Sequence, residues 1–121
     1  MDCIFCKIIK GDIPSYTVYE DDIVKAFLDI HPDSDGHILI IPKTHITDID
    51  GMDENTFTRI LEVTKKLKKA LEEKLQINGL TLVQNNGCIQ EVKHFHLHLK
   101  PFYKNKKGIS SVEEIYNILK P

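Results

Sequence analysis

The chain has 121 residues, of which 41% are hydrophobic and 28% are charged, and its formal net charge is -2. This length supports one domain with a single core, and a near balance of acidic and basic residues gives no electrostatic indication of a nucleic-acid partner. The N-terminal residues contain no apolar run as long as a signal peptide or a membrane span, so we expect a cytoplasmic protein with no membrane partner.

The first predicted element is a short helix or turn over residues 3–10, which ends at Gly11 because glycine relaxes the backbone. It contains Cys3 and Cys6 in a Cys-x-x-Cys pair. In a reducing compartment such a pair indicates a metal or redox site before it indicates a disulfide. No thioredoxin-like βαβ pattern surrounds it, which makes the redox interpretation the weaker one. A metal site would need two further ligands.

Three predicted strands follow. Residues 16–20 and 23–29 alternate, are rich in β-branched and aromatic side chains and are separated by two aspartates, which predicts a hairpin. The Pro, Asp, Ser and Gly residues of 31–36 predict a turn. Residues 37–43 are almost continuously apolar, as expected of a strand that is buried on both faces.

Apolar residues at three- and four-residue spacing predict a long amphipathic helix over 54–75. Two more strands are predicted at 80–84 and 93–100. A last helix is predicted over 111–119, with Ser110 and a glutamate three residues later as a capping box.

These elements together predict an α+β fold in one domain over residues 1–121. It has a five-stranded, mostly antiparallel sheet, one long helix and short terminal helices.

The strand at 93–100 alternates histidines with apolar residues: His94, His96 and His98 on one face, and Phe95, Leu97 and Leu99 on the other. The apolar face is expected to pack under the long helix, so the histidine face must line a pocket or meet water. One such histidine would be an ordinary half-buried residue, but three in register all need partners for their ring nitrogens. Zinc could supply partners, yet structural zinc closes at four ligands, so the histidines must divide between roles.

The segment "HFHLHLK" resembles the signature of the histidine triad family. "CIFCKIIKGDIP", "AFLDI", "GHILIIPKTH", "NNG" and "QEVKHFHLHLKP" are similar to that family's blocks in the same order. The resemblance covers residues 2–101 and leaves 105–121 without a family signal. It implies a zinc-containing, homodimeric nucleotide hydrolase that cleaves at the α-phosphorus of nucleoside phosphoramidates or related conjugates and releases a purine nucleoside monophosphate.

The same resemblance implies a role for each catalytic histidine. His96 would be the nucleophile and form a nucleotidyl-histidine that water resolves. His98 would hydrogen-bond a phosphate oxygen, and His37 would order the cluster near the leaving group. The chemistry agrees with these roles, because an imidazole with a pKa of about 6.5 offers a free lone pair near pH 7.

The resemblance also assigns binding residues. The structural zinc ligands would be Cys3, Cys6, His45 and His94. The walls of the base pocket would be Ile4, Phe5, Ile8, Phe27 and Ile30. Asp29 would accept hydrogen bonds from the ribose hydroxyls, and Asn85 would approach the phosphate.

The sequence departs from the family pattern near the triad. Ile89 replaces a glycine, Lys100 replaces the last apolar residue of the signature, and Cys88 in the same loop is interpreted as a bystander. Glu91 replaces a small hydroxyl residue at the substrate site, and a carboxylate there should disfavour highly anionic leaving groups and favour amines.

Other functions stay open at this point. One is a zinc-containing nucleotide-sensing module with little turnover, and another is a dinucleoside polyphosphate hydrolase. A nucleotidyl transferase is disfavoured, because relatives of that branch carry glutamine at the position of His98.

Overall fold

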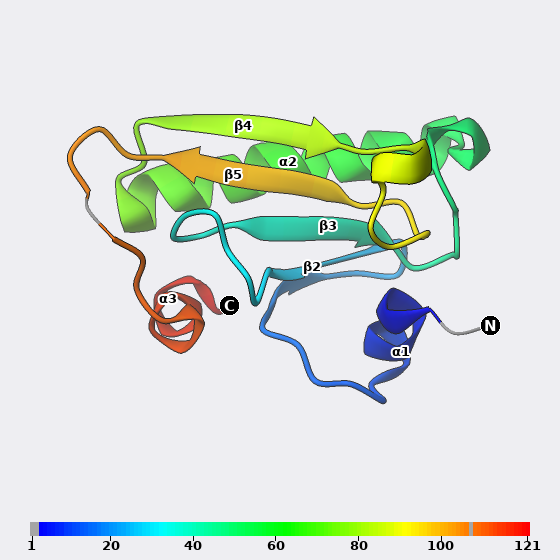
Figure 1. The fold of residues 1–121 in the computed structure, drawn as a ribbon, viewed down its shortest axis with the longest axis horizontal. Helices are drawn as coiled ribbons and strands as arrows, with labels where there is room; N and C mark the ends of the chain where they lie inside the picture. The colour runs from blue at the N-terminus through cyan, green and yellow to red at the C-terminus, as the bar shows by residue number, and fades with distance from the viewer. Residues whose placement is uncertain (1–2, 107) are drawn as a thin grey trace.

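The computed structural model of the protein describes residues 3–106 and 108–121. Five strands form one antiparallel sheet in the order β1-β2-β3-β5-β4 (Figure 1). The strands are β1 (Thr17–Glu20), β2 (Val24–Leu28), β3 (Ile38–Pro42), β4 (Gly79–Gln84) and β5 (Leu97–Phe102). The helices are α1 (Ile4–Lys10), α2 (Glu54–Leu75) and α3 (Val112–Leu119), with short 3-10 turns η1 (Ile49–Gly51) and η2 (Gly87–Ile89). The predicted α+β fold is confirmed.

The sheet is covered on both faces, by different helices. The long helix α2 packs along one face and buries Ile60, Val63, Leu67 and Leu71 there. The shorter α1 covers part of the other face, near β2 and β3 (Figure 1). As predicted, β3 is buried along its whole length, because its alternate side chains enter these two different cores.

Capping residues set the ends of the helices. The Cys3 side chain accepts a hydrogen bond from the Cys6 amide at the start of α1, and Gly11 ends this helix in the left-handed conformation with a φ of 87°. The Asp53 carboxylate caps α2 by accepting from the amide of Thr56. No helix of the described residues is long and apolar enough to cross a membrane.

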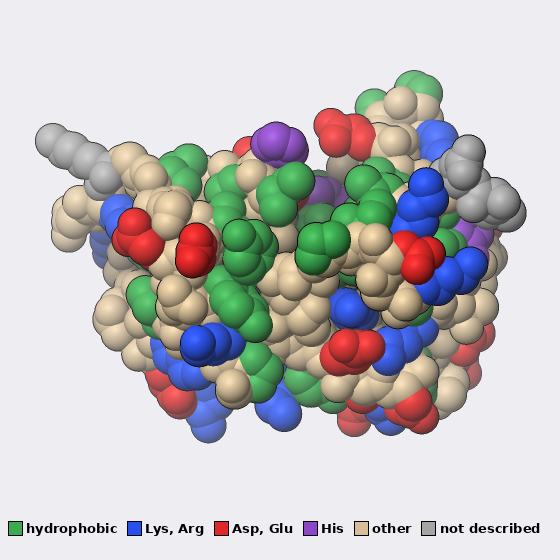
Figure 2. Space-filling view, turned by 90° about the horizontal axis from the view of Figure 1, so that it is seen from below, with side chains coloured by type: hydrophobic (Ala, Val, Ile, Leu, Met, Phe, Trp, Pro, Cys, Tyr) green, Lys and Arg blue, Asp and Glu red, His purple; other side chains and the backbone are tan. Residues whose placement is uncertain are grey.

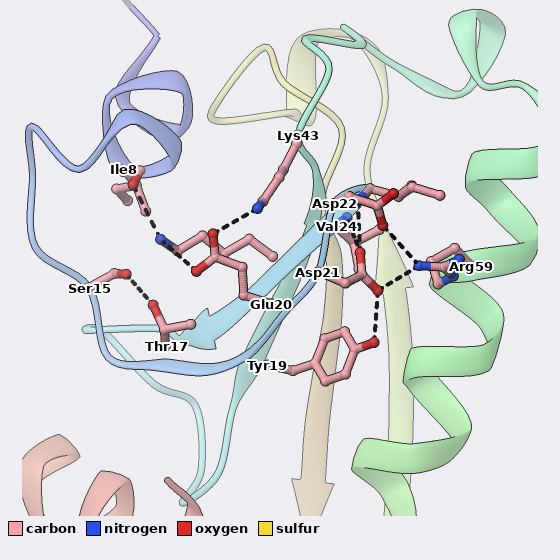
Figure 3. Close-up of polar contacts among 12 residues, drawn as sticks. Ile8, Ser15, Thr17, Tyr19, Glu20, Asp21, Asp22, Val24, Lys43 and Arg59 are labelled. Carbon is pink, nitrogen blue, oxygen red and sulfur yellow. Dashed lines mark hydrogen bonds and ion pairs between the residues drawn. The ribbon is translucent and has the colours of Figure 1, made fainter. Parts of the chain in front are cut away.

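The β1–β2 hairpin is closed by Asp21 (Figure 3). Its carboxylate accepts hydrogen bonds from the Ile23 and Val24 amides at 2.8 and 2.9 Å, and from the Tyr19 hydroxyl at 2.7 Å. Arg59 of α2 donates to the same carboxylate at 2.8 Å. Burial disfavours the charge, but these hydrogen bonds outweigh it and hold the pKa of Asp21 well below its usual range. The hairpin is thereby attached to α2.

Strand β5 differs from its predicted range of 93–100. It begins at Leu97 and continues to Phe102. The preceding residues do not join the ladder, and the Phe95 amide donates instead to the carbonyl of Ile46 in a loop. His94 and His96 therefore lie just before the strand, while Phe95 still enters the core against α2 as expected.

The cap of α3 also differs from the prediction. Ser111, rather than Ser110, accepts the hydrogen bond from the Glu114 amide at 3.1 Å. The Ser110 amide donates to the buried carboxylate of Asp35 at 2.8 Å, which holds Ser110 outside the helix.

Candidate active site and metal site

Four metal-ligating side chains meet where α1 approaches the segment before β5. The Cys3 Sγ lies 3.4 Å from Nδ1 of His94, and the Cys6 Sγ lies 3.2 Å from Nδ1 of His45 and 3.6 Å from Nδ1 of His94. All four ligand atoms lie within 4.8 Å of one another. Ordinary Zn–S and Zn–N bond lengths in a tetrahedron put sulfur and nitrogen ligands roughly 3.5 Å apart. The spacing of this cluster fits such an ion.

The protonation of His94 also suits a metal ligand. Its Nε2 donates to the Pro42 carbonyl at 2.8 Å, which leaves an unprotonated Nδ1 facing the two sulfur atoms. Burial, together with the neighbouring His45 and His96, lowers the pKa of His94 and keeps the ring neutral. Burial and the neighbouring Cys3 raise the pKa of Cys6, and a bound dication would reverse this and favour the thiolate.

His96 is fixed in one orientation. Its Nδ1 donates to the carbonyl of His94 at 2.8 Å, and the edge of the Phe5 ring meets the imidazole at a centroid distance of 5.1 Å. The side chain is 5% exposed. In the neutral ring this contact places the proton on Nδ1, and Nε2 keeps a free lone pair.

His37 and His98 form a second fixed pair. The Asp33 amide donates to Nδ1 of His37 at 3.0 Å, so the proton of a neutral His37 must reside on Nε2. This Nε2 lies 2.9 Å from Nδ1 of His98 and donates to it. His98 then carries its own proton on Nε2, where it is available to donate to a ligand. The Asp29 carboxylate lies 3.6 Å from Nε2 of His37.

The surroundings favour neutral rings in this pair. Burial, and then His96, His37 and Lys100, lower the pKa of His98 to about 4. Burial also lowers the pKa of His37, although nearby Asp29 partly opposes the shift. Near neutral pH, His98 can therefore donate one hydrogen bond from Nε2 without carrying a positive charge.

The histidines open into a cavity of about 270 Å³. It is lined by Asp29, His31, Asp33, His37, Asn85, Glu91, His96, His98 and Lys100. Figure 2 shows histidine side chains in and beside a notch in the outline of the molecule, with hydrophobic side chains around it. The predicted site residues Asp29, Asn85 and Glu91 thus line the same cavity as His37, His96 and His98.

Three of the lining residues, His31, Asp33 and Lys100, were not among the predicted site residues. Asp33 orients His37 through its backbone amide, and its carboxylate pairs with Nζ of Lys100 at 2.8 Å. The turn signal of residues 31–36 places Asp33 in a loop, but a backbone donor leaves no mark in the side-chain pattern. Lys100 is visible in the sequence as a departure from the triad signature.

The residues expected to wall the base pocket are divided between two environments. Phe5, Ile8 and Phe27 are buried in the small core beneath α1. Ile4 and Ile30 are 48% and 64% exposed. None of the five lines the 270 Å³ cavity, so the exposed Ile4 and Ile30 are the ones accessible to a ligand.

Comparison with known proteins gives consistent results. The HIT domain family matches residues 10–105. An uncharacterized HIT-like protein of Methanocaldococcus jannaschii is 42% identical over 118 residues, which are 96% of this chain and 91% of that protein. The adenosine 5′-monophosphoramidase of Candida albicans is 46% identical over 115 residues, covering 88% of this chain and 74% of that protein. A zinc-bound histidine triad family protein of Mycobacterium smegmatis has a TM-score of 0.88 and 34% identity, covering 98% of this chain and 91% of the other.

Proposed function

The chain belongs to the histidine triad family, and on this basis we propose that it hydrolyses nucleoside phosphoramidates at the α-phosphorus and releases a nucleoside monophosphate. The observation that carries the proposal is the orientation of His96. Its Nδ1 is bound to the His94 carbonyl, so in the neutral ring Nε2 is the nitrogen left to act as a nucleophile at the wall of the cavity. The monophosphoramidase name of the Candida albicans relative supports the same substrate class.

In the proposed reaction, Nε2 of His96 forms a bond to phosphorus while the bond from phosphorus to the amine nitrogen breaks. The amine nitrogen takes a proton from solvent water as it leaves. The Nε2 proton of His98 binds a non-bridging phosphate oxygen, where negative charge is held in the transition state. Water then attacks phosphorus and breaks the bond to His96, which completes the monophosphate, and the proton lost by this water returns to solvent. His37 maintains the tautomer of His98 throughout.

The charges of the cavity favour an amine as the leaving group. Among the described residues, Asp29, Asp33 and Glu91 place three carboxylates around it, whereas Lys100 is the one lysine that lines it. A polyphosphate leaving group would bring several more negative charges among these carboxylates. The dinucleoside polyphosphate reaction is therefore the less favoured alternative.

We also propose that Cys3, Cys6, His45 and His94 hold a structural zinc ion. The sulfur-to-nitrogen distances and the unprotonated Nδ1 of His94 support this assignment. Zinc would supply a fixed tetrahedral junction between the start of α1 and the segment before β5.

A third proposal is a homodimer that uses the β4 edge. In the described residues β4 pairs with β5 alone, so its outer side offers unpaired backbone groups. Leu82 of β4 is 50% exposed, and Phe57 and Leu61 of α2 are 48% and 49% exposed. Sedimentation equilibrium should give twice the chain mass, and Leu82→Asp should shift the protein toward monomer. A wild-type monomer at all concentrations would contradict this proposal.

The enzymatic proposal is tested by AMP release from adenosine 5′-phosphoramidate. Wild type should release AMP, and His96→Ala should lose activity on the order of 10⁴-fold or more, as expected for removal of a nucleophile. A rapid alkaline quench, which preserves the acid-labile bond from phosphorus to nitrogen, should allow mass spectrometry to detect a nucleotidyl group on His96. The control is AMP binding by His96→Ala, which shows that the variant remains folded. Tight AMP binding by wild type without any turnover would favour the sensing module instead.

A further inference from the structure

A second cavity adjoins the histidine cavity, and Lys100 and Asp33 line both. It measures about 540 Å³. The Lys100 Nζ and the Asp33 Oδ2 are 2.8 Å apart, so this ion pair lies on the boundary between the two cavities. A substrate bound at His96 and His98 could extend past the ion pair into the second cavity.

The side chains along this direction come from one strand. His98, Lys100 and Phe102 are alternate residues of β5 and project from the same face, with a spacing of about 7 Å between successive side chains. Thr81 and Val83 of β4 pair with Lys100 and His98, and their side chains share this face. On this face of β5, the cationic side chain of Lys100 is therefore the next one after His98, the histidine expected to bind phosphate.

Lys100 is available to a ligand, in contrast to Lys106, which also lines the second cavity. Lys106 Nζ lies 2.8 Å from Oδ2 of Asp35, a carboxylate whose side chain is 2% exposed. The Asp33 side chain that pairs with Lys100 is 63% exposed. Exposed ion pairs contribute little free energy, so an incoming anion can replace Asp33 at small cost. The ammonium group has three donors and can also bind both anions together.

We propose that Lys100 determines specificity by binding a carboxylate carried on the amine leaving group. This inference rests on the proposed phosphoramidate hydrolysis. The carboxylate would lie two bonds from the departing nitrogen and would take no part in bond breaking. One such charge is balanced by Lys100, whereas a polyphosphate chain would meet the carboxylates of Asp29 and Glu91 as well.

The test compares two matched substrates, the adenosine 5′-phosphoramidates of glycine and of glycinamide. The leaving groups have nearly the same shape and differ in one negative charge. The measured quantity is the ratio of kcat/KM for glycine to kcat/KM for glycinamide. Lys100→Met should lower this ratio roughly three- to tenfold, the range expected for a partly exposed charge pair. Asp33→Asn should raise the ratio, because it removes the competing carboxylate.

Two variants serve as controls. Lys100→Arg should retain most of the ratio, and Lys104→Met, which removes a nearby exposed lysine outside both cavities, should leave it unchanged. Equal losses on both substrates in Lys100→Met would overturn the inference while leaving phosphoramidate hydrolysis intact. Failure of the wild type to release AMP from either substrate, or from the unsubstituted phosphoramidate, would overturn the proposed function and this inference with it.

Discussion

His98 is a half-buried histidine whose charge state should influence stability. Its pKa is lowered to about 4, first by burial. The charged or titratable groups that face it are His96, His37, Lys100 and Asp29. An unfolded histidine has a pKa of about 6.5, so between about pH 6.5 and 4 the unfolded chain binds a proton that the folded chain does not. The stability contribution is present above this window and is lost as the pH falls through it.

We therefore expect the free energy of unfolding to fall from pH 7 to pH 5, by at most about 1.4 kcal/mol per pH unit for this group. Urea unfolding of wild type and of His98→Gln, at several pH values and equal zinc concentration, measures this free energy. The free energy of unfolding should fall less steeply with decreasing pH in the variant than in wild type. Carboxylates with lowered pKa values, such as Glu20 and Asp33, titrate below this range. The same dependence of unfolding free energy on pH in the two proteins would count against a neutral His98.

Gly36 is the residue that lets the loop before β3 approach α2. Its φ is 86°, and a Cβ there would lie 2.8 Å from Leu75 Cδ1 and 2.9 Å from Leu71 Cδ2. Gly36→Ala should lose about 1–2 kcal/mol for the left-handed backbone and roughly 1–3 kcal/mol more for overpacking. Gly11→Ala is the matched control, because its φ is 87° and a Cβ there meets nothing within 4 Å. Equal losses of unfolding free energy in the two variants would show that the contact with α2 is unimportant.

Helix α3 depends on its first turn. Ser111 caps it, and Ile115 and Leu119 attach it to the main core. Ser111→Ala should lower the free energy of unfolding by about 1 kcal/mol. Ser110→Ala should have a smaller effect, because the Ser110 backbone amide, which the substitution retains, makes the contact with Asp35. Thermal unfolding of the two variants distinguishes the observed cap from the predicted one.

The elements were predictable to different degrees for physical reasons. The hydrophobic pattern gave the bounds of α2 correctly, because 22 residues of regular spacing average out local exceptions. The predicted start of β5 was wrong. Polar and apolar residues already alternate from Lys93 to His96, but the Phe95 amide donates to the carbonyl of Ile46 in a loop and not to a neighbouring strand. The α3 cap was wrong because two adjacent serines can each cap a helix, and Asp35, 75 residues before Ser110, decides between them.

The metal site and the histidine cavity were also predictable only in part. The alternating histidines and the cysteine pair indicated residues that the structure brings together, and the family resemblance assigns them to a metal site and to catalysis. The pattern could not reveal the backbone contacts that set the tautomers, from the Asp33 amide to His37 and from His96 to the His94 carbonyl. It also could not reveal that Lys100 lies between two cavities.

At the scale of the whole molecule, the proposed zinc ion joins the N-terminal helix to the rest of the fold. Removing zinc with a chelator should lower the free energy of unfolding by about 4 kcal/mol. The reference is the protein in free zinc at about 1,000 times the Kd of the zinc site. Hydrogen exchange should rise first in α1. Cys3→Ser should abolish the effect of the chelator, whereas Cys88→Ser, at an exposed cysteine outside the cluster, should not. Unchanged unfolding temperatures with and without chelator would exclude a structural zinc role.

His94 serves both sites with different atoms: its ring faces the cysteines, and its carbonyl holds His96. The two sites are therefore separated by a fixed length of chain. An inserted residue between His94 and His96 would rotate His96, the proposed nucleophile, away from the cavity even if both histidines were retained. Insertions and deletions in this segment should consequently be far less tolerated than single substitutions at Lys93, whose side chain is exposed.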